Sequence, residues 1–308
     1  MIVVCGEALM DVFAGADTAS GLMMDARIGG SPLNVAIGLA RLNQPVAFFG
    51  ALSRDVLGQR LLRALHDEGV ATEGVARVDA PTTLSLVGLD DSGVPTYSFH
   101  GHGCADRLLP IDALARVPAP ARAFHFGSYA MVIEPVSATQ RALVEREHRR
   151  SLIAYDPNIR LNVEPDIQRW REILQWMLPR THLLKISSED LDLLYPEQDA
   201  AALARGWITQ GVALVVVTHG AAGVSAWTAD QALCVAPVTV EVVDTVGAGD
   251  TFQAALLAAL AERDVLSADA LRAMPAAFLR EVLGFATRAA AITCSRRGAD
   301  LPRRGELD

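Results

Sequence analysis

The chain has 308 residues, long enough for one large α/β domain or two smaller ones, and 51% of them are hydrophobic, which is ample for a sizeable core. The 27 basic and 36 acidic residues give a net charge of −9, which makes the chain a poor candidate for binding nucleic acid or an anionic membrane. Lys185 is the one lysine, so no P-loop motif is present. The 4 cysteines are far apart in the sequence and predict reduced thiols in a cytoplasmic protein.

The N-terminal segment predicts a buried strand. Residues 2–5 are apolar and are followed by Gly6, a pattern typical of a strand covered on both faces. No basic segment precedes them, so we expect no signal peptide, and no apolar run reaches membrane-spanning length. Asp11 lies just beyond the expected carboxyl end of this strand, where open α/β sheets bind ligands. It is a candidate ligand-binding residue, although a solvated loop acid would fit the pattern too.

A diglycine precedes the next element. After Gly29-Gly30, Ser31 and Pro32 predict the start of a helix, with Ser31 as its N-cap. Asn34 falls in the first turn, where its amide can offer both a donor and an acceptor to a polyhydroxy ligand. The diglycine itself predicts a flexible joint.

Two alternating runs predict a small second sheet. Residues 82–89 and 94–99 flank the turn residues 90–93, which is a β-hairpin pattern, and no helix separates the two strands. Residues 11–28 are expected to join this sheet. Attached through Gly29-Gly30, it would act as a lid formed by about residues 11–28 and 82–104. An exposed sheet edge is a natural surface for a homodimer.

Strands and helices alternate through most of the chain, which predicts a parallel sheet flanked by helices. The expected strands are 46–52, 124–127, 152–155, 182–186 and 214–218, and the expected helices are 57–68, 135–149, 166–177, 200–210 and 278–293. The strand ends would deliver polar residues to one edge, among them Asn158, Arg160, Glu189 or Asp190, and Thr218. Such carboxylates, with an arginine, suggest nucleotide phosphates and Mg²⁺. The tail from Pro302 is expected to be loose.

The stretch Gly247-Ala248-Gly249-Asp250 is expected at a turn between a strand over 233–243 and a helix too apolar to be exposed. Glycines leave backbone N–H groups uncovered, and the helix points its positive end the same way. This arrangement predicts an anion cradle suited to phosphate oxygens. Asp250 would repel a phosphate there unless it takes a proton from the attacking group. The alternative is that Asp250 merely caps the helix.

A second glycine pair follows the strand over 214–218. Gly220 and Gly223 predict a tight loop that could line a nucleotide, although an ordinary hairpin turn fits them equally well.

With both glycine motifs, the chain resembles the ribokinase-like (PfkB) family of carbohydrate kinases from Val3 to about Pro302. The resemblance rests on Gly29-Gly30 with Asn34, and on residues 244–252. It implies a three-layer αβα fold with a mostly parallel central sheet and a small β-sheet lid, in a single domain over residues 1–308. It also implies an ATP-dependent sugar kinase in which Asp250 is the general base and the turn of Gly247, Ala248 and Gly249 holds the transferred phosphoryl group.

The resemblance assigns further roles. The sugar would be bound by Asp11, Gly29, Gly30, Asn34 and Arg160. The Mg-ATP side would be formed by Asn158, Lys185, Ser187, Thr218, Gly220, Gly223, Gly247 and Gly249. Ser187 and Asp190 replace the usual Asn-x-x-Glu pattern, which leaves open whether Glu189 or Asp190 organises Mg²⁺ through water. Some members bind K⁺, for which Asp244 and the carbonyl of Val246 would be ligands.

Within the family, the segment from Tyr97 to His100, followed by Ala105-Asp106, is similar to fructokinases. The 2-keto-3-deoxygluconate kinases tend to carry Tyr-x-Arg in this segment to meet a substrate carboxylate, and His100 takes the place of the arginine here. A neutral ketose is therefore expected, with the keto acid as an alternative. A nucleoside kinase would also fit the sequence, as would a catalytically silent sensor of a sugar or nucleotide on the same fold.

Overall fold

An eight-stranded, mostly parallel sheet forms the centre of the structure, a computed structural model that describes residues 1–89 and 95–308. The strand order is β14-β13-β12-β11-β10-β9-β1-β4, and only the pairs made by β13 are antiparallel. The strands are β1 (Ile2–Cys5), β4 (Val46–Phe49), β9 (Ala123–Gly127), β10 (Leu152–Asp156), β11 (Leu183–Ser187), β12 (Leu214–Thr218), β13 (Val224–Trp227) and β14 (Ala232–Val235).

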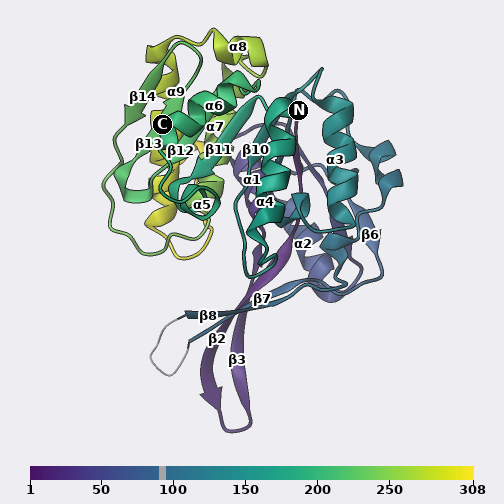
Figure 1. Cartoon of the computed structure of the whole chain (residues 1–308). Coiled ribbons are helices and arrows are strands. Elements are labelled where there is room, and N and C mark those ends of the chain that lie inside the picture. Colours follow the sequence, from purple (N-terminus) through teal and green to yellow (C-terminus); the bar gives the residue numbers. More distant parts are fainter. Residues whose placement is uncertain (90–94) are drawn as a thin grey trace.

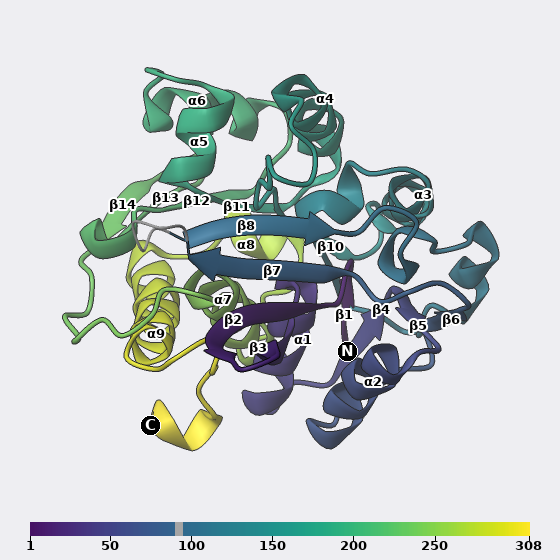
Figure 2. The same cartoon turned by 90° about the horizontal axis from the view of Figure 1, so that it is seen from below.

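Helices cover both faces of this sheet, so the body has three layers (Figure 2). Successive side chains of a strand point to opposite faces. In β1, Val4 packs into the layer of α1, α2, α7, α8 and α9, whereas Val3 packs into the layer of α3, α4, α5 and α6. The helices are α1 (Ser31–Arg41), α2 (Val56–Asp67), α3 (Val136–Glu147), α4 (Ile167–Met177), α5 (Ser188–Leu194), α6 (Ala200–Thr209), α7 (Ala248–Glu262), α8 (Ala268–Arg272) and α9 (Ala276–Cys294). The predicted αβα layers are confirmed.

Helix α7, which begins at the glycine turn, is deeply buried. Its residues from Thr251 to Leu260 are all buried, because α1 and α9 flank it on one face of the sheet. Small alanine side chains fill much of this stretch and let the neighbouring helices approach closely. The expectation of a helix too apolar to be exposed is confirmed.

A second, smaller sheet projects from the body (Figure 1). It contains β2 (Leu9–Thr18), β3 (Gly21–Gly29), β7 (Leu84–Leu89) and β8 (Pro95–His100), in the order β3-β2-β7-β8. The inner pair, β2 and β7, is parallel, and the outer pairs are antiparallel. The predicted second sheet is confirmed, whereas the turn predicted at residues 90–93 lies outside the described residues.

Two predicted strands have different limits. The strand expected over 46–52 divides into β4 and β5 (Ala51–Ser53), and β5 pairs with β6 (Ala76–Val78) instead of continuing in the central sheet. The strand expected over 233–243 ends at Val235, and residues 236–247 form no strand. Pro237 has no N–H to donate to a sheet, which explains the early end. The glycine turn therefore follows an irregular segment.

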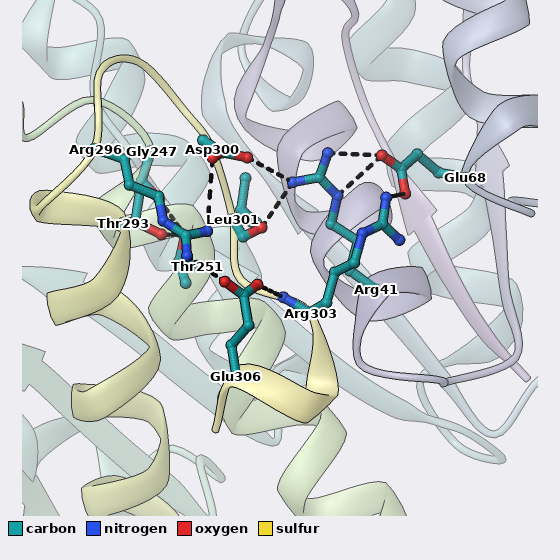
Figure 3. A network of polar contacts seen from close by, with 10 residues as sticks. All are labelled: Arg41, Glu68, Gly247, Thr251, Thr293, Arg296, Asp300, Leu301, Arg303 and Glu306. Atoms are coloured by element: carbon teal, nitrogen blue, oxygen red, sulfur yellow. Dashed lines mark hydrogen bonds and ion pairs between the residues drawn. The ribbon is translucent and has the colours of Figure 1, made fainter. Parts of the chain in front are cut away.

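The tail from Pro302 is anchored, contrary to expectation. Leu301 is buried, and Arg303 forms an ion pair with Glu68 at the end of α2. Glu306 accepts a hydrogen bond from the N–H of Arg303 and pairs with Arg296 (Figure 3). The tail is thus held by ion pairs between residues that are far apart in the sequence. The local composition of the tail did not predict these contacts. Among the described residues, no helix is both long and apolar enough to cross a membrane.

Candidate active site

The glycine turn, residues 247–250, opens helix α7. Gly247 is the N-cap and has a left-handed φ of 79°, a conformation that favours glycine. A Cβ at this position would lie 2.6 Å from the Cβ of Ala299, so the close approach of that residue also requires glycine. The N–H of Ala248 donates to Thr245. Those of Gly249 and Asp250 have no hydrogen-bond partner in the part of the chain that the structure describes, as is usual for the first turn of a helix.

Asp250 does not cap its helix, so that alternative is wrong. Its carboxylate accepts a hydrogen bond of 2.6 Å from the Ser31 hydroxyl and one of 2.8 Å from the Asn34 amide. The prediction that Ser31 is the N-cap of α1 is also wrong. Gly30 occupies the N-cap position, and the Ser31 hydroxyl donates to Asp250 instead. Two residues of α1 therefore fix the orientation of a carboxylate on α7.

The diglycine joins the small sheet to the body, because Gly29 ends β3 and Gly30 is the N-cap of α1. A Cβ on Gly29 would lie 2.1 Å from a carboxylate oxygen of Asp11, and one on Gly30, whose φ is 105°, would lie 2.9 Å from the carbonyl oxygen of Glu7. Burial raises the pKa of Asp11, and the charge of Asp250 adds to this effect. A hydrogen bond from Ser85 and the charge of Arg160 act in the opposite direction. Asp11 is therefore close enough to Asp250 for the two charges to interact.

The strand register decides which side chains share a face with Asp11. Asp11 pairs with Arg27 and Ser85, and Ser85 pairs with Phe99, so these four side chains point to the same face. His100, the next residue after Phe99, points to the opposite face. The side chain at position 99 is therefore the one that shares the face of Asp11, and the use of His100 to separate ketoses from keto acids stays a prediction.

Arg27 was not predicted as a site residue. A Cβ on Gly298 would lie 3.0 Å from an Nη atom of Arg27, which places this guanidinium beside the loop that follows α9. The N–H of Gly298 donates to Asp244, which precedes the glycine turn. Arg27 thus reaches from the small sheet to the surroundings of the glycine turn. Because the reach depends on the pairing of β2 with β3, the sequence alone carried no signal for it.

A buried ion pair lies at the carboxyl edge of the central sheet. The Lys185 ammonium donates a hydrogen bond of 2.7 Å to Asp156, and the two side chains are 5% and 3% exposed. A Cβ on Gly249 would lie 3.2 Å from the Lys185 Nζ, so the ammonium lies against the glycine turn. Lys185 was predicted as a site residue, whereas Asp156 was not.

The two acids proposed for Mg²⁺ differ in environment. Asp190 is buried and accepts a hydrogen bond of 3.1 Å from the N–H of Ile159, whereas Glu189 is exposed. Burial and the charge of Asp156 raise the pKa of Asp190 to about 6. Ser187 caps α5 by accepting a hydrogen bond from the N–H of Asp190. Asp190 is the acid that faces the other charged groups of the site.

Other predicted residues lie along the same edge. Asn158 has a φ of 42° and a buried amide nitrogen without a hydrogen-bond partner among the described residues. Arg160 is exposed, and its charge acts on both Asp11 and Asp190. Thr218 pairs with Ser187 in the sheet, which places it at this edge as well.

The loop with Gly220 and Gly223 follows β12. Gly223 has a φ of 93°, and a Cβ on it would lie 2.3 Å from the Val235 carbonyl oxygen, so β14 limits its side chain. Gly220 has a φ of 52° and no atom within 4 Å of an added Cβ. No hydrogen bond among the described residues joins these two glycines to Asp250.

The loops around the glycine turn are tied together by Asp244. Its carboxylate accepts hydrogen bonds from the N–H groups of Val246 (3.0 Å) and Gly298 (2.8 Å). Farther along, Asp300 pairs with both Arg296 and Arg41, and Arg41 pairs with Glu68 (Figure 3). This network fixes the segment that packs against Gly247.

Comparisons with known proteins show the family of the chain. The model of the pfkB family of carbohydrate kinases matches residues 1–304. A fructokinase from Rhizobium leguminosarum bv. trifolii is 37% identical over 267 residues, which cover 87% of this chain and 82% of that protein. Fructokinase-2 from Solanum habrochaites is 31% identical over 308 residues, which cover 97% of this chain and 92% of that protein.

The overall architecture is also shared with solved structures. A fructokinase from Xylella fastidiosa, crystallised with bound ATP, superposes with a TM-score of 0.89 at 29% identity and covers 99% of this chain and 96% of that one. The fold is therefore the expected ribokinase-like α/β fold. From residue 1 to residue 304, the chain belongs to the pfkB family of carbohydrate kinases.

Proposed function

We propose that this sugar kinase is a fructokinase, which transfers the γ-phosphate of ATP to a primary hydroxyl of fructose. The observation that carries the proposal is the Asp250 carboxylate, which Ser31 and Asn34 hold beside the glycine turn. Phosphoryl transfer to an alcohol needs such a base next to groups that bind the phosphate. Fructose as the acceptor is supported by the names of the relatives at 37% and 31% identity.

In the proposed step, Asp250 takes the proton of the primary hydroxyl, and the sugar oxygen forms a bond to the γ-phosphorus. The bond between that phosphorus and the oxygen bridging to the β-phosphate breaks, and ADP leaves with the electron pair. The N–H groups of Gly249 and Asp250, with Lys185 and Arg160, stabilise the charge on the transferred group. Gly247 and Ala248 shape the turn that presents these N–H groups.

Within a single kinase domain over residues 1–308, we assign the small sheet as a lid of about residues 11–28 and 82–104. The sugar would lie between this lid and the glycine turn, in contact with Asp11, Gly29, Gly30, Asn34 and Arg160. Movement about the diglycine would close the lid and exclude water, which is the competing nucleophile. Gly29 ends β3 and Gly30 is the N-cap of α1, so the diglycine is where the small sheet passes into the body.

ATP would lie along the edge that carries Asn158, Lys185, Ser187, Thr218, Gly220 and Gly223, together with Gly247 and Gly249. The ATP-bound Xylella fastidiosa structure supports ATP as the donor. Phosphate oxygens and water usually complete a Mg²⁺ site, and a buried carboxylate at the phosphate end fits this chemistry. We therefore assign Asp190, in preference to the exposed Glu189, to hold the waters of Mg²⁺, which neutralises phosphate charge when bound.

The loop before the glycine turn offers a K⁺ site. The Asp244 carboxylate and the carbonyl of Val246 are oxygen donors of the kind that hard cations bind. The two hydrogen bonds of 3.0 and 2.8 Å that Asp244 accepts leave lone pairs on its oxygens for a cation. Activity with K⁺ present and absent, in a buffer without other small monovalent cations, tests this assignment.

One observation favours a second candidate substrate. Arg27 shares the face of Asp11, so an arginine from the lid could meet the carboxylate of 2-keto-3-deoxygluconate. In contrast, the apolar Phe99 on that face favours a neutral sugar. The experiment is ATP consumption by the purified protein with fructose, 2-keto-3-deoxygluconate, ribose and adenosine. A preference for fructose supports the proposal, a preference for the keto acid or adenosine contradicts it, and no turnover would favour the sensor.

We also propose a homodimer formed through the lid, and a cytoplasmic location. Leu22, Met23 and Met24 on the edge strand β3 are 46%, 62% and 55% exposed, which is unusual for an unpaired sheet edge. A sedimentation mass of two chains that falls to one when Met23 is replaced by Lys would support the dimer. The free cysteines favour a reducing compartment.

A further inference from the structure

The ion pair of Lys185 and Asp156 is unusual in its burial. Lys185 is the single lysine of the chain, and it lies in β11, beside the last residue of β10. A buried ion pair contributes little to stability, because the cost of removing two charges from water offsets their attraction. A pair of apolar residues at these two positions would often give a protein that is equally stable. A functional reason for the pair is therefore expected.

The geometry directs the ammonium toward the glycine turn. One N–H of Lys185 donates to Asp156, and its other two have no acceptor among the described residues. The Nζ lies 3.2 Å from the place of a Cβ on Gly249. A larger residue there would meet the ammonium. The free N–H groups thus lie where the transferred phosphoryl group is proposed to bind.

The groups around Lys185 keep it charged. Burial alone lowers the pKa of the Lys185 ammonium, but the charge of Asp156 and its hydrogen bond, with the charges of Asp190 and Asp250, raise it above its ordinary value. His125 also faces Lys185, and burial together with the lysine charge lowers the pKa of this imidazole to about 3. The ring of His125 lies 3.3 Å from the amide nitrogen of Gln253, and because the imidazole is neutral it adds no second positive charge beside the ammonium.

We propose that Asp156 is a positioning residue for phosphoryl transfer, which holds the Lys185 ammonium against the glycine turn so that it donates a hydrogen bond to the transferred phosphoryl group. This inference rests on the proposed kinase function and extends it. Lys185 touches the reacting group, whereas Asp156 acts through Lys185. Asp156 also keeps one oxygen buried without a partner among the described residues, which fits a carboxylate whose main contact is the ammonium.

The test uses the fact that a single lysine gives a single side-chain signal. Protein labelled with ¹⁵N-lysine shows one Nζ resonance by NMR, and addition of Mg-ADP or a non-hydrolysable ATP analogue should shift it. An unchanged resonance at saturating nucleotide would overturn the inference. This measurement requires no variant and no knowledge of the sugar, so it remains informative if fructose is not the substrate.

The second arm is the Asp156→Asn variant, which keeps the shape but removes the charge. We expect kcat to fall about 10- to 100-fold, the range for one charge-assisted hydrogen bond in the transition state, with little change in the KM for the sugar. The Nζ resonance should then titrate at lower pH than in the wild type, and activity relative to wild type should rise as pH falls. A structural role alone would lower the melting temperature and leave the kcat and its pH profile unchanged.

A double variant separates the two roles further. If Asp156 acts through Lys185, then Asp156→Asn combined with Lys185→Met should be no less active than Lys185→Met alone. Additive losses would contradict the inference. If the wild type phosphorylates fructose and Asp156→Asn has the same kcat, the proposed fructokinase function stands. The positioning role of Asp156 would then be contradicted.

Discussion

Replacement of Gly247 by Ala should disable the glycine turn for two separable reasons. At a φ of 79°, an alanine costs about 1–2 kcal/mol in backbone conformational energy. The added Cβ would also lie 2.6 Å from the Ala299 Cβ and 2.9 Å from its Cα, so the backbone of one loop must move. Overpacking of this kind costs a further ~1–3 kcal/mol. The sum predicts a loss of about 2–5 kcal/mol in the free energy of unfolding.

The chain offers a matched control for the backbone contribution. Gly69 has a φ of +78°, nearly that of Gly247, but no atom lies within 4 Å of an added Cβ. Gly69→Ala should therefore lose only the ~1–2 kcal/mol of conformational energy. The difference between the two variants, measured by urea unfolding, isolates the clash with Ala299.

Activity provides the functional readout. A movement of about 1 Å in the turn should lower kcat about 100-fold, because the N–H groups no longer meet the transferred phosphoryl group, while Gly69→Ala should match the wild type. Kinetics should be measured well below the melting temperature of each variant. Equal unfolding energies and equal kcat values for Gly247→Ala and Gly69→Ala would refute the reasoning.

Three other changes test separate parts of the structure. Burial raises the pKa of Glu7 from 4.5 to about 8, so the folded state holds the Glu7 proton more tightly than the unfolded state does. The stability that this protonated carboxyl contributes is therefore lost as pH rises from 4.5 through 8. Glu7→Gln should therefore reduce the fall in unfolding free energy between pH 5 and pH 9, and an unchanged fall would contradict the assignment. Ser31→Ala removes one of the two hydrogen bonds to Asp250 and should lower kcat about 10-fold with a melting temperature close to wild type; a wild-type kcat would show that the bond is dispensable. Arg41→Met should loosen the segment that packs on Gly247 and lower the unfolding free energy by about 1–3 kcal/mol, and adding 1 M NaCl to the wild type should reproduce only part of that loss.

The sequence predicted elements whose signals are local. β1 is a continuous apolar run followed by glycine, and α7 is a segment rich in Ala and Leu that begins at the glycine turn, so their type and burial follow from composition and periodicity. Asp250 was found because a motif marks it, and for this residue local pattern and tertiary position agree. Asp11 was expected just beyond the end of β1, whereas it lies within β2 of the small sheet.

Features that depend on distant partners could not be predicted. Ser31 has the pattern of an N-cap, but its hydroxyl bonds to a residue 219 positions away. The tail has the composition of a loose end, yet Arg303 pairs with Glu68, 235 positions away. The face of His100 depends on which residue of β7 it pairs with, and that register is a tertiary property. The role inferred for Asp156 likewise arises from the neighbouring strand.

The measurement that tests the central claim most directly is phosphoryl transfer from labelled ATP to fructose by Asp250→Asn. The amide can still accept from Asn34 and donate to Ser31, so the fold and fructose binding, followed by calorimetry, should persist. We predict that kcat falls by about 100-fold or more, because no base removes the proton of the hydroxyl. Transfer at the wild-type rate in a variant that still binds fructose would contradict the account.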